Sequence, residues 1–319
     1  MRKIKKIKGG FSLFVTEDEK YLVTTNSRNS VYVYDLKTRK LKFQTKTLSN
    51  VSKKVVSPDR KVLAVKNTCG HMALILMETG EEIGRTKMEE REGGQMTFTS
   101  DGKFVIDFDR DGRTMILNCE TMSHEILDGP SKRYVSELPR VAHMQYDRYS
   151  NQIYKIIADS FGCSVGRIMV SSLDPNNIDY KVIREFPDKI PDFLYGFSLC
   201  KAHNYYVDKQ TKEFVVTDKQ FKEVKRIKLP KQIDKDNSQI YKMWVSPCER
   251  YMFIIMLHYD INEFTQKKDN FLHFSYLFDL DTMELVQEFD YPYTSDFTMI
   301  NEDKTFIIST WEGTYIGDI

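Results

Sequence analysis

A short polar turn between two apolar stretches recurs seven times along the chain, and this repeat limits the possible folds more than any other feature. The three clearest copies are Val15 with TEDEK and Tyr21, Val56 with SPDRK and Val62, and Phe98 with TSDGK and Phe104. Looser copies are DRYSN after Tyr146, CKAHN after Leu199, SPCER after Val245 and NEDKT after Ile300. Asp, Asn, Pro, Gly and Ser supply the backbone angles of tight turns, so each copy predicts a β-hairpin.

A second pattern follows most hairpins and supplies two further strands. It is seen in VYVYDLKTRKLKF from Val31, ALILMETGEEIGR from Ala73, TMILNCETMSHEI from Thr114 and YLFDLDTMELVQEF from Tyr276. Connections this short cannot join parallel strands, so each unit is a four-stranded antiparallel meander. A period of roughly 40 to 55 residues is typical of β-propeller blades. We therefore expect an all-β, seven-bladed β-propeller of four-stranded antiparallel blades, in a single domain over residues 1–319.

The two ends of the chain predict how the ring closes. The last copy offers Gly313–Ile319 after its hairpin and then ends, one strand short, while residues 2–8 form a strand-like segment without a local partner. We expect this N-terminal strand to pair with residues 313–318 and complete the last blade. Its five basic residues suit an edge strand, where charge discourages aggregation. Nucleic-acid or membrane binding is the alternative, and the net charge of +1 disfavours it.

The sequence also predicts a compartment. No apolar run approaches the roughly 18 residues that span a bilayer, and the apolar stretch before Thr16 is too short for the core of a signal peptide. The five cysteines are odd in number and lack paired spacing. We therefore expect a cytoplasmic protein with reduced thiols.

Two segments carry a family resemblance. Residues Val31–Thr38 read VYVYDLKT and residues Tyr276–Thr282 read YLFDLDT, and both resemble the third strand of WD-repeat seven-bladed propellers, where an aromatic residue precedes Asp. Tyr34 and Phe278 replace the tryptophan of that motif, and the Gly-His pair that opens a WD repeat is missing. The resemblance implies the same fold and, by analogy, a role as a scaffold for protein contacts.

The common catalytic motifs are missing from the sequence. The six histidines include no H-E-x-x-H spacing, and neither G-x-S-x-G nor a Walker loop occurs. Cys69-Gly70-His71 lacks the further ligands of a zinc site and fits a hairpin loop better. The alternative to a scaffold is a lactonase- or hydrolase-type propeller enzyme with its site at the central channel. The innermost strands, such as Tyr241–Val245, offer few ionisable groups, so we expect no enzymatic activity and no cofactor.

A partial calcium motif is the remaining metal candidate. Asp107, Asp109 and Asp111, followed by Gly112, match the alternating carboxylates that open a calcium loop. The twelfth position is Asn118 where such a loop needs a bidentate Glu, and the residues before it have the pattern of a strand. A tight turn at Asp111-Gly112 accounts for the same residues without a metal ion, so we predict no metal site.

The longer loops are predicted to share one face. In a meander of this kind, the connections between blades and the turns between second and third strands emerge together, and long loops on a rigid scaffold commonly carry function. We expect this face to bind a protein or peptide, but neither nucleic acid nor membrane. The alternative is that each ring packs onto a neighbouring loop. The candidate contact residues are aromatic or arginine side chains of the type that anchor interfaces: Arg133, Tyr134, Arg140, Phe193, Tyr259, Phe264, Tyr291, Tyr293 and Trp311.

Overall fold

In a computed structural model of the protein, the described residues form β-strands joined by turns and loops. The described part comprises residues 4–26, 28–88, 95–108, 113–128, 140–158, 166–172, 174, 178–186, 197–208, 211, 213–231, 233, 238–261, 268–291 and 293–319. Its strands form seven four-stranded antiparallel sheets, as the repeats predicted. Within these residues there is no helix with the length and apolar character needed to cross a membrane.

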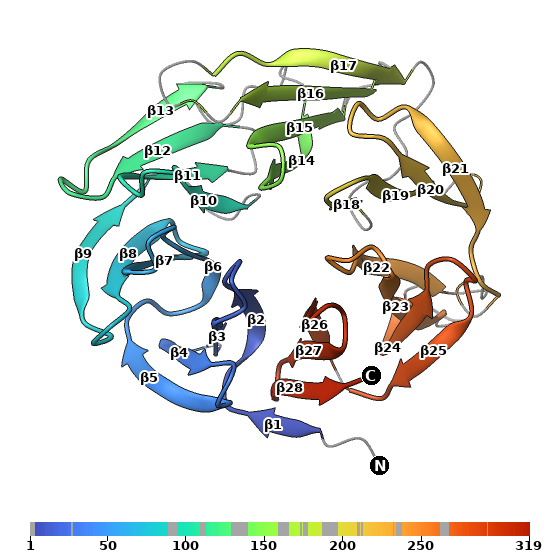
Figure 1. Ribbon diagram of the computed structural model, residues 1–319, viewed down its shortest axis with the longest axis horizontal. Coiled ribbons are helices and arrows are strands. Elements are labelled where there is room, and N and C mark those ends of the chain that lie inside the picture. Colours follow the sequence, from blue (N-terminus) through green and yellow to red (C-terminus); the bar gives the residue numbers. More distant parts are fainter. Residues whose placement is uncertain are drawn as a thin grey trace. The chain divides into compact units, whose positions relative to one another are not determined.

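The chain divides into two compact units, and residues 12–190 form one of them. Its sheets use strands that are consecutive in sequence, each pairing with the next (Figure 1). The strands are β2 (Gly10–Val15), β3 (Tyr21–Thr25), β4 (Ser30–Asp35) and β5 (Lys40–Lys46); β6 (Val51–Val56), β7 (Val62–Asn67), β8 (His71–Leu76) and β9 (Glu82–Lys87); β10 (Met96–Phe98), β11 (Phe104–Phe108), β12 (Thr114–Asn118) and β13 (His124–Asp128); and β14 (Arg140–Asp147), β15 (Gln152–Ala158), β16 (Gly166–Ser172) and β17 (Lys181–Phe186).

The other unit joins residues 1–11 to residues 191–319. Two of its sheets again use consecutive strands, and the third takes one strand from the start of the chain. The strands are β18 (Phe197–Leu199), β19 (Asn204–Asp208), β20 (Glu213–Thr217) and β21 (Glu223–Lys228); β22 (Ser238–Val245), β23 (Tyr251–Ile261), β24 (Lys268–Asp279) and β25 (Leu285–Phe289); and β26 (Thr294–Ile300), β27 (Thr305–Thr310), β28 (Gly313–Asp318) and β1 (Lys5–Ile7). The expectation of a single domain stays a prediction.

The N-terminal strand completes the last sheet, which confirms the predicted closure. β1 lies antiparallel beside β28, with Lys5, Lys6 and Ile7 opposite Ile316, Tyr315 and Thr314 (Figure 1). The Ile7 side chain is only 8% exposed. The paired Thr314 also donates a hydrogen bond from its hydroxyl to the carbonyl of Gly9, just beyond β1, at 2.8 Å. The described strand covers Lys5–Ile7, a shorter stretch than the predicted residues 2–8.

The repeated polar turn has one hydrogen-bonding scheme in four blades. A hydroxyl at its first position accepts a hydrogen bond from the N–H five residues later, as Thr16 does from Tyr21 at 3.0 Å and Ser57 from Val62 at 3.0 Å. Thr99 and Ser246 repeat this scheme. The fourth position takes a positive φ, which is 72° at Gly102. The recurring Ser or Thr thus closes the loop, and the sequence pattern reports its geometry directly.

The Asp-Leu-x-Thr pattern forms the turn between third and fourth strands. One Asp35 oxygen accepts hydrogen bonds from the Thr38 N–H at 2.7 Å and from the Thr38 hydroxyl at 2.8 Å. Asp279 and Thr282 repeat both contacts. An Asp side chain that bonds to the backbone ahead of it fixes a tight turn. The motif that resembles a WD repeat therefore has a local structural role in this chain.

The outermost strands contain β-bulges that discourage aggregation. Each sheet built only from consecutive strands shows a register shift where its fourth strand pairs with its third. Such bulges twist an edge strand and discourage pairing with other chains. Several exposed apolar residues lie on these edges, including Leu41, Ile83 and Val224. The bulges offset the aggregation risk that these residues carry.

The core consists of apolar layers between neighbouring sheets. In the unit with residues 191–319, aromatic rings fill one layer, where Phe253 and Phe297 stack with centroids 3.8 Å apart. Phe289 packs against both Phe253 and Phe306 in the same cluster. Stacked and edge-on ring pairs add to the free energy gained from burial alone. This layer packs against residues of both β26 and β27.

Candidate functional site

Trp311 is the most exposed large apolar side chain in the described part of the chain, at 66%. It lies in the tight turn between β27 and β28. The Thr310 hydroxyl fixes this turn, because it accepts a hydrogen bond from the Glu312 N–H and donates one to the Gly313 carbonyl, each at 3.1 Å. The indole is therefore held outward by a rigid turn and not by a flexible loop.

Tyr293 forms a parallel stack with Trp311. The ring centroids lie 5.1 Å apart with an interplanar angle of 18°, and Tyr293 is itself 48% exposed. Tyr293 follows β25 in the connection to β26, whereas Trp311 belongs to a turn between second and third strands. These are the two kinds of loop that the sequence placed on one face, and the stack shows that they meet here.

Backbone strain flanks the exposed indole. Tyr293 has a φ of 55° and Phe11, whose ring lies 6.4 Å from Trp311, has a φ of 71°. Bulky residues rarely adopt this left-handed conformation, which costs on the order of 1 kcal/mol or more for each residue. Strained residues of this kind concentrate at ligand-binding sites. Because both rings lie close to an exposed tryptophan, this surface is a functional candidate.

His273 extends the row of rings inward from Tyr293. Its imidazole lies 5.3 Å from the Tyr293 ring and 6.0 Å from the Tyr241 ring. The Nδ1 atom is buried, and no described group makes a hydrogen bond with it. Burial lowers the pKa of His273, so the ring is neutral at pH 7. We call Phe11, Tyr241, His273, Tyr293 and Trp311 the aromatic surface.

A second stack lies beside the aromatic surface and is less accessible. Tyr291 and Tyr315 stack with centroids 4.1 Å apart, and the Lys6 ammonium lies 5.3 Å from the Tyr315 ring. A hydrogen bond with Tyr315 raises the pKa of Lys6, and burial raises that of Tyr291. Lys6 also pairs with Glu312 at 3.6 Å. Tyr291 packs against the aromatic core layer, so the alternative of an inward-packed ring applies to it.

The predicted contact residues have different outcomes. Tyr293 and Trp311 come together at the surface, and Tyr291 packs beside them. Arg140 lies on β14 and Tyr259 on β23, but their side chains fall outside the described part. Sequence reasoning missed Phe11, Tyr241 and His273, because strand residues carry no signal for a surface that forms between loops. Four predicted residues lie outside the described residues altogether: Arg133, Tyr134, Phe193 and Phe264.

Asp107 of the partial calcium motif forms ion pairs with two lysines. Its carboxylate is fully buried and pairs with Lys53 at 2.6 Å and with Lys66. Burial alone would raise its pKa, but the two ammonium groups outweigh this effect and lower it. Asp109 and Asp111 lie outside the described residues. Within the described chain, no three His, Cys, Asp or Glu side chains gather as a metal site would require.

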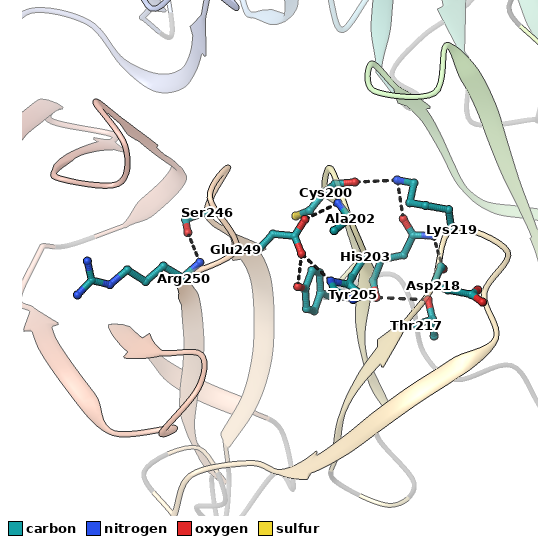
Figure 2. Close-up of polar contacts among 11 residues, drawn as sticks. Cys200, Ala202, His203, Tyr205, Thr217, Asp218, Lys219, Ser246, Glu249 and Arg250 are labelled. Carbon is teal, nitrogen blue, oxygen red and sulfur yellow. Dashed lines mark hydrogen bonds and ion pairs between the residues drawn. The ribbon is translucent and has the colours of Figure 1, made fainter.

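A polar cluster around Glu249 was not foreseen from the sequence (Figure 2). Its carboxylate accepts hydrogen bonds from the Ala202 N–H at 2.6 Å and the Tyr205 hydroxyl at 2.6 Å, and lies 2.8 Å from His203 Nδ1. Burial alone would raise the pKa of Glu249, but these hydrogen bonds outweigh it and lower the pKa. The carboxylate links the first turns of two neighbouring sheets through these three contacts, an arrangement that suits a structural role.

Structural comparison shows which fold the sheets form. The chain is similar to the Cps50 (Swd1) beta-propeller domain of Myceliophteria thermophila, with a TM-score of 0.70, 10% sequence identity, and coverage of 99% of this chain and 100% of that one. It is also similar to Kuenenia stuttgartiensis hydrazine synthase, with a TM-score of 0.65, 13% identity, and coverage of 98% and 96%. The fold is a seven-bladed β-propeller. At these identities the likeness concerns the fold alone.

Sequence comparison adds no relative. No protein-family model matches the chain, and no curated protein matches it. The aromatic surface and the charged clusters must therefore be interpreted from their own chemistry.

Proposed function

We propose that this protein is a non-catalytic scaffold that binds a protein or peptide through the aromatic surface. One observation carries the proposal: Trp311 and Tyr293 form an exposed stack, with backbone strain at Tyr293 itself and at the nearby Phe11. Tryptophan and tyrosine dominate binding energy at interfaces because they bury a large area at little cost in conformational entropy. A rigid turn presents the stack, so little further ordering is needed on binding.

The charged clusters favour binding over catalysis. Glu249 has its oxygens occupied by three donors, and Asp107 is buried between two lysines. A catalytic carboxylate needs an open position next to the reacting atom. Asp107 is fully buried, and Glu249 already holds three hydrogen-bond contacts, which supports a structural role for both. The proposal includes a cytoplasmic location and no role for nucleic acid or membrane, which rests on the sequence.

Peptide display tests the proposal. A library of random twelve-residue peptides is selected on the immobilised protein, and binders are titrated against the wild type and Trp311→Ala. We expect the substitution to weaken binding by about tenfold or more, the loss typical of an interface anchor. The chain contains two tryptophans, and Trp244 is half-buried against Phe253. Binding should therefore shift tryptophan emission to shorter wavelength in the wild type and leave Trp311→Phe without that shift.

The matched control is Val224→Ala on β21. Val224 is 60% exposed and lies on an outermost strand, so its truncation also removes exposed apolar area but not at the aromatic surface. This variant should bind peptides like the wild type. Peptides that bind Trp311→Ala and the wild type equally would contradict the proposed site, and a library that yields no specific binder would contradict peptide binding itself.

A further inference from the structure

The second and third strands of one blade are much longer than their counterparts. β23 has 11 residues and β24 has 12, whereas β27 and β28 of the next sheet have 6 each. The pairing of β23 with β24 continues to Ile261 opposite Lys268. These two strands therefore project from their blade as a two-stranded ribbon, on the side of the blade where the loops of the aromatic surface lie.

The ribbon extends beyond the strands that flank it. β22 pairs with β23 as far as His258, and β25 pairs with β24 from Ser275 onward. No described strand pairs with the outer edge of β24 over residues 268–273. An unpaired edge presents a row of backbone N–H and C=O groups, which another extended chain can complete. Two-stranded ribbons are marginally stable on their own, so a third strand would also stabilise this one.

A bulge in the ribbon limits what can dock there. The register shifts between His258 and Asp260, where β24 contains one more residue than β23. Bulges increase local twist, and a twisted edge resists pairing with another preformed sheet. A single flexible peptide can follow the twist. The edge of about six residues, roughly 20 Å long, fits one short strand and does not favour open-ended assembly.

We propose that the edge of β24 over residues 268–273, which no described strand covers, binds the partner as an added β-strand, with the aromatic surface holding its side chains. His273 connects the two features, because it lies on β24 and its ring contacts Tyr293. Side chains of an added strand alternate between its two faces. Every second residue of the partner near His273 therefore lies against the aromatic surface, which selects an extended segment with aliphatic or aromatic residues at alternate positions. This inference rests on the proposed function and specifies its mode of recognition.

Backbone methylation of a selected peptide tests the mode directly. N-methyl groups are placed on each peptide amide in turn, and binding of each variant to the wild-type protein is measured. An added strand predicts losses of about tenfold or more at alternate amides, with the amides between them tolerant. Hydrogen exchange of the wild-type protein should show slower exchange in residues 268–273 when the unmodified peptide is bound.

A shortened ribbon provides the complementary variant. Replacing residues 259–271 with Asn-Gly joins His258 to Leu272, which are already paired, through a two-residue hairpin turn. This variant should bind the selected peptide at least tenfold more weakly than the wild type does. If the variant does not fold, hydrogen exchange of the wild-type protein still tests whether residues 268–273 pair with the peptide.

The outcomes separate the added strand from the proposed function. Binding without alternation and without protection of residues 268–273 overturns the added strand, while sensitivity to Trp311→Ala would leave the proposed function intact. Alternation and protection without sensitivity to Trp311→Ala would support strand addition at β24. The same result would overturn the aromatic surface as the binding site, both in the proposed function and as the part of this inference that holds the partner's side chains. The absence of any binder overturns both.

Discussion

Replacing Ile7 with alanine should destabilise the protein through loss of ring closure at the last blade. Ile7 is the last residue of β1 and is 8% exposed opposite Thr314. Truncating a buried isoleucine removes its transfer free energy and leaves a cavity, which typically costs about 2–5 kcal/mol. Because β1 is an edge strand whose surroundings can partly relax, we expect about 2–3 kcal/mol for Ile7→Ala.

Ile4 provides a control of the same residue type. It immediately precedes β1 and is 44% exposed, so Ile4→Ala removes the same atoms from a site that stays largely in water. Its cost should be about 1 kcal/mol or less. Urea unfolding followed by circular dichroism gives both free energies, with equal dependence on urea concentration in the wild type and the variants.

Deletion of residues 2–8 extends the same test. It removes the three paired residues of β1 and should cost more than Ile7→Ala, since the outer edge of β28 loses its partner. Equal free energies of unfolding for Ile4→Ala and Ile7→Ala would refute the reasoning, as would a deletion variant as stable as the wild type. Either result would mean that β1 contributes nothing to the last sheet.

Two further substitutions probe the partly buried Glu249 and the fully buried Asp107. Glu249→Gln should lower stability by about 1–3 kcal/mol at pH 7, because it replaces charge-assisted hydrogen bonds from Tyr205 and the Ala202 N–H with neutral ones. The pKa of Glu249 is lowered in the folded state, so the stability that its charge contributes is complete above the unfolded pKa and is lost as pH falls through the folded pKa. In thermal unfolding, the difference in stability between the wild type and Glu249→Gln should therefore shrink from pH 7 to pH 3. A difference that stays constant over this range would contradict the reasoning. Asp107→Asn should cost about 3–5 kcal/mol in urea unfolding, because it leaves two buried lysines without their carboxylate. A cost near zero there would show that the lysines are compensated elsewhere.

Much of the fold could be predicted because its signals are local. The first turn of a blade depends on residues five apart, as in Thr16 and Tyr21, and the Asp35–Thr38 turn depends on residues three apart. Both interactions lie within one loop, so the residue types alone encode them. The closure by β1 was also predictable, since a ring of equal blades leaves one place for a single unpaired strand.

The candidate site was predicted in part. The exposure of Trp311 and Tyr293 follows from loop position, which the repeat pattern gives. The contributions of Phe11 and His273 do not, because these residues lie on strands and contact Trp311 and Tyr293 only in the folded chain. The Glu249 cluster has the same origin, since its donors come from the turn of another blade.

The sequence by itself determined the number of blades, the chemistry of their turns and the strand that completes the last one, because each depends on short-range hydrogen bonding or on counting repeats. The tertiary structure decided which side chains meet between blades: the aromatic surface, the lysine pair around Asp107, and the ribbon edge that β25 leaves uncovered. These features depend on how far each strand extends and on which faces pack together. Contacts between residues far apart in sequence form only through tertiary packing, so no local sequence pattern predicts them.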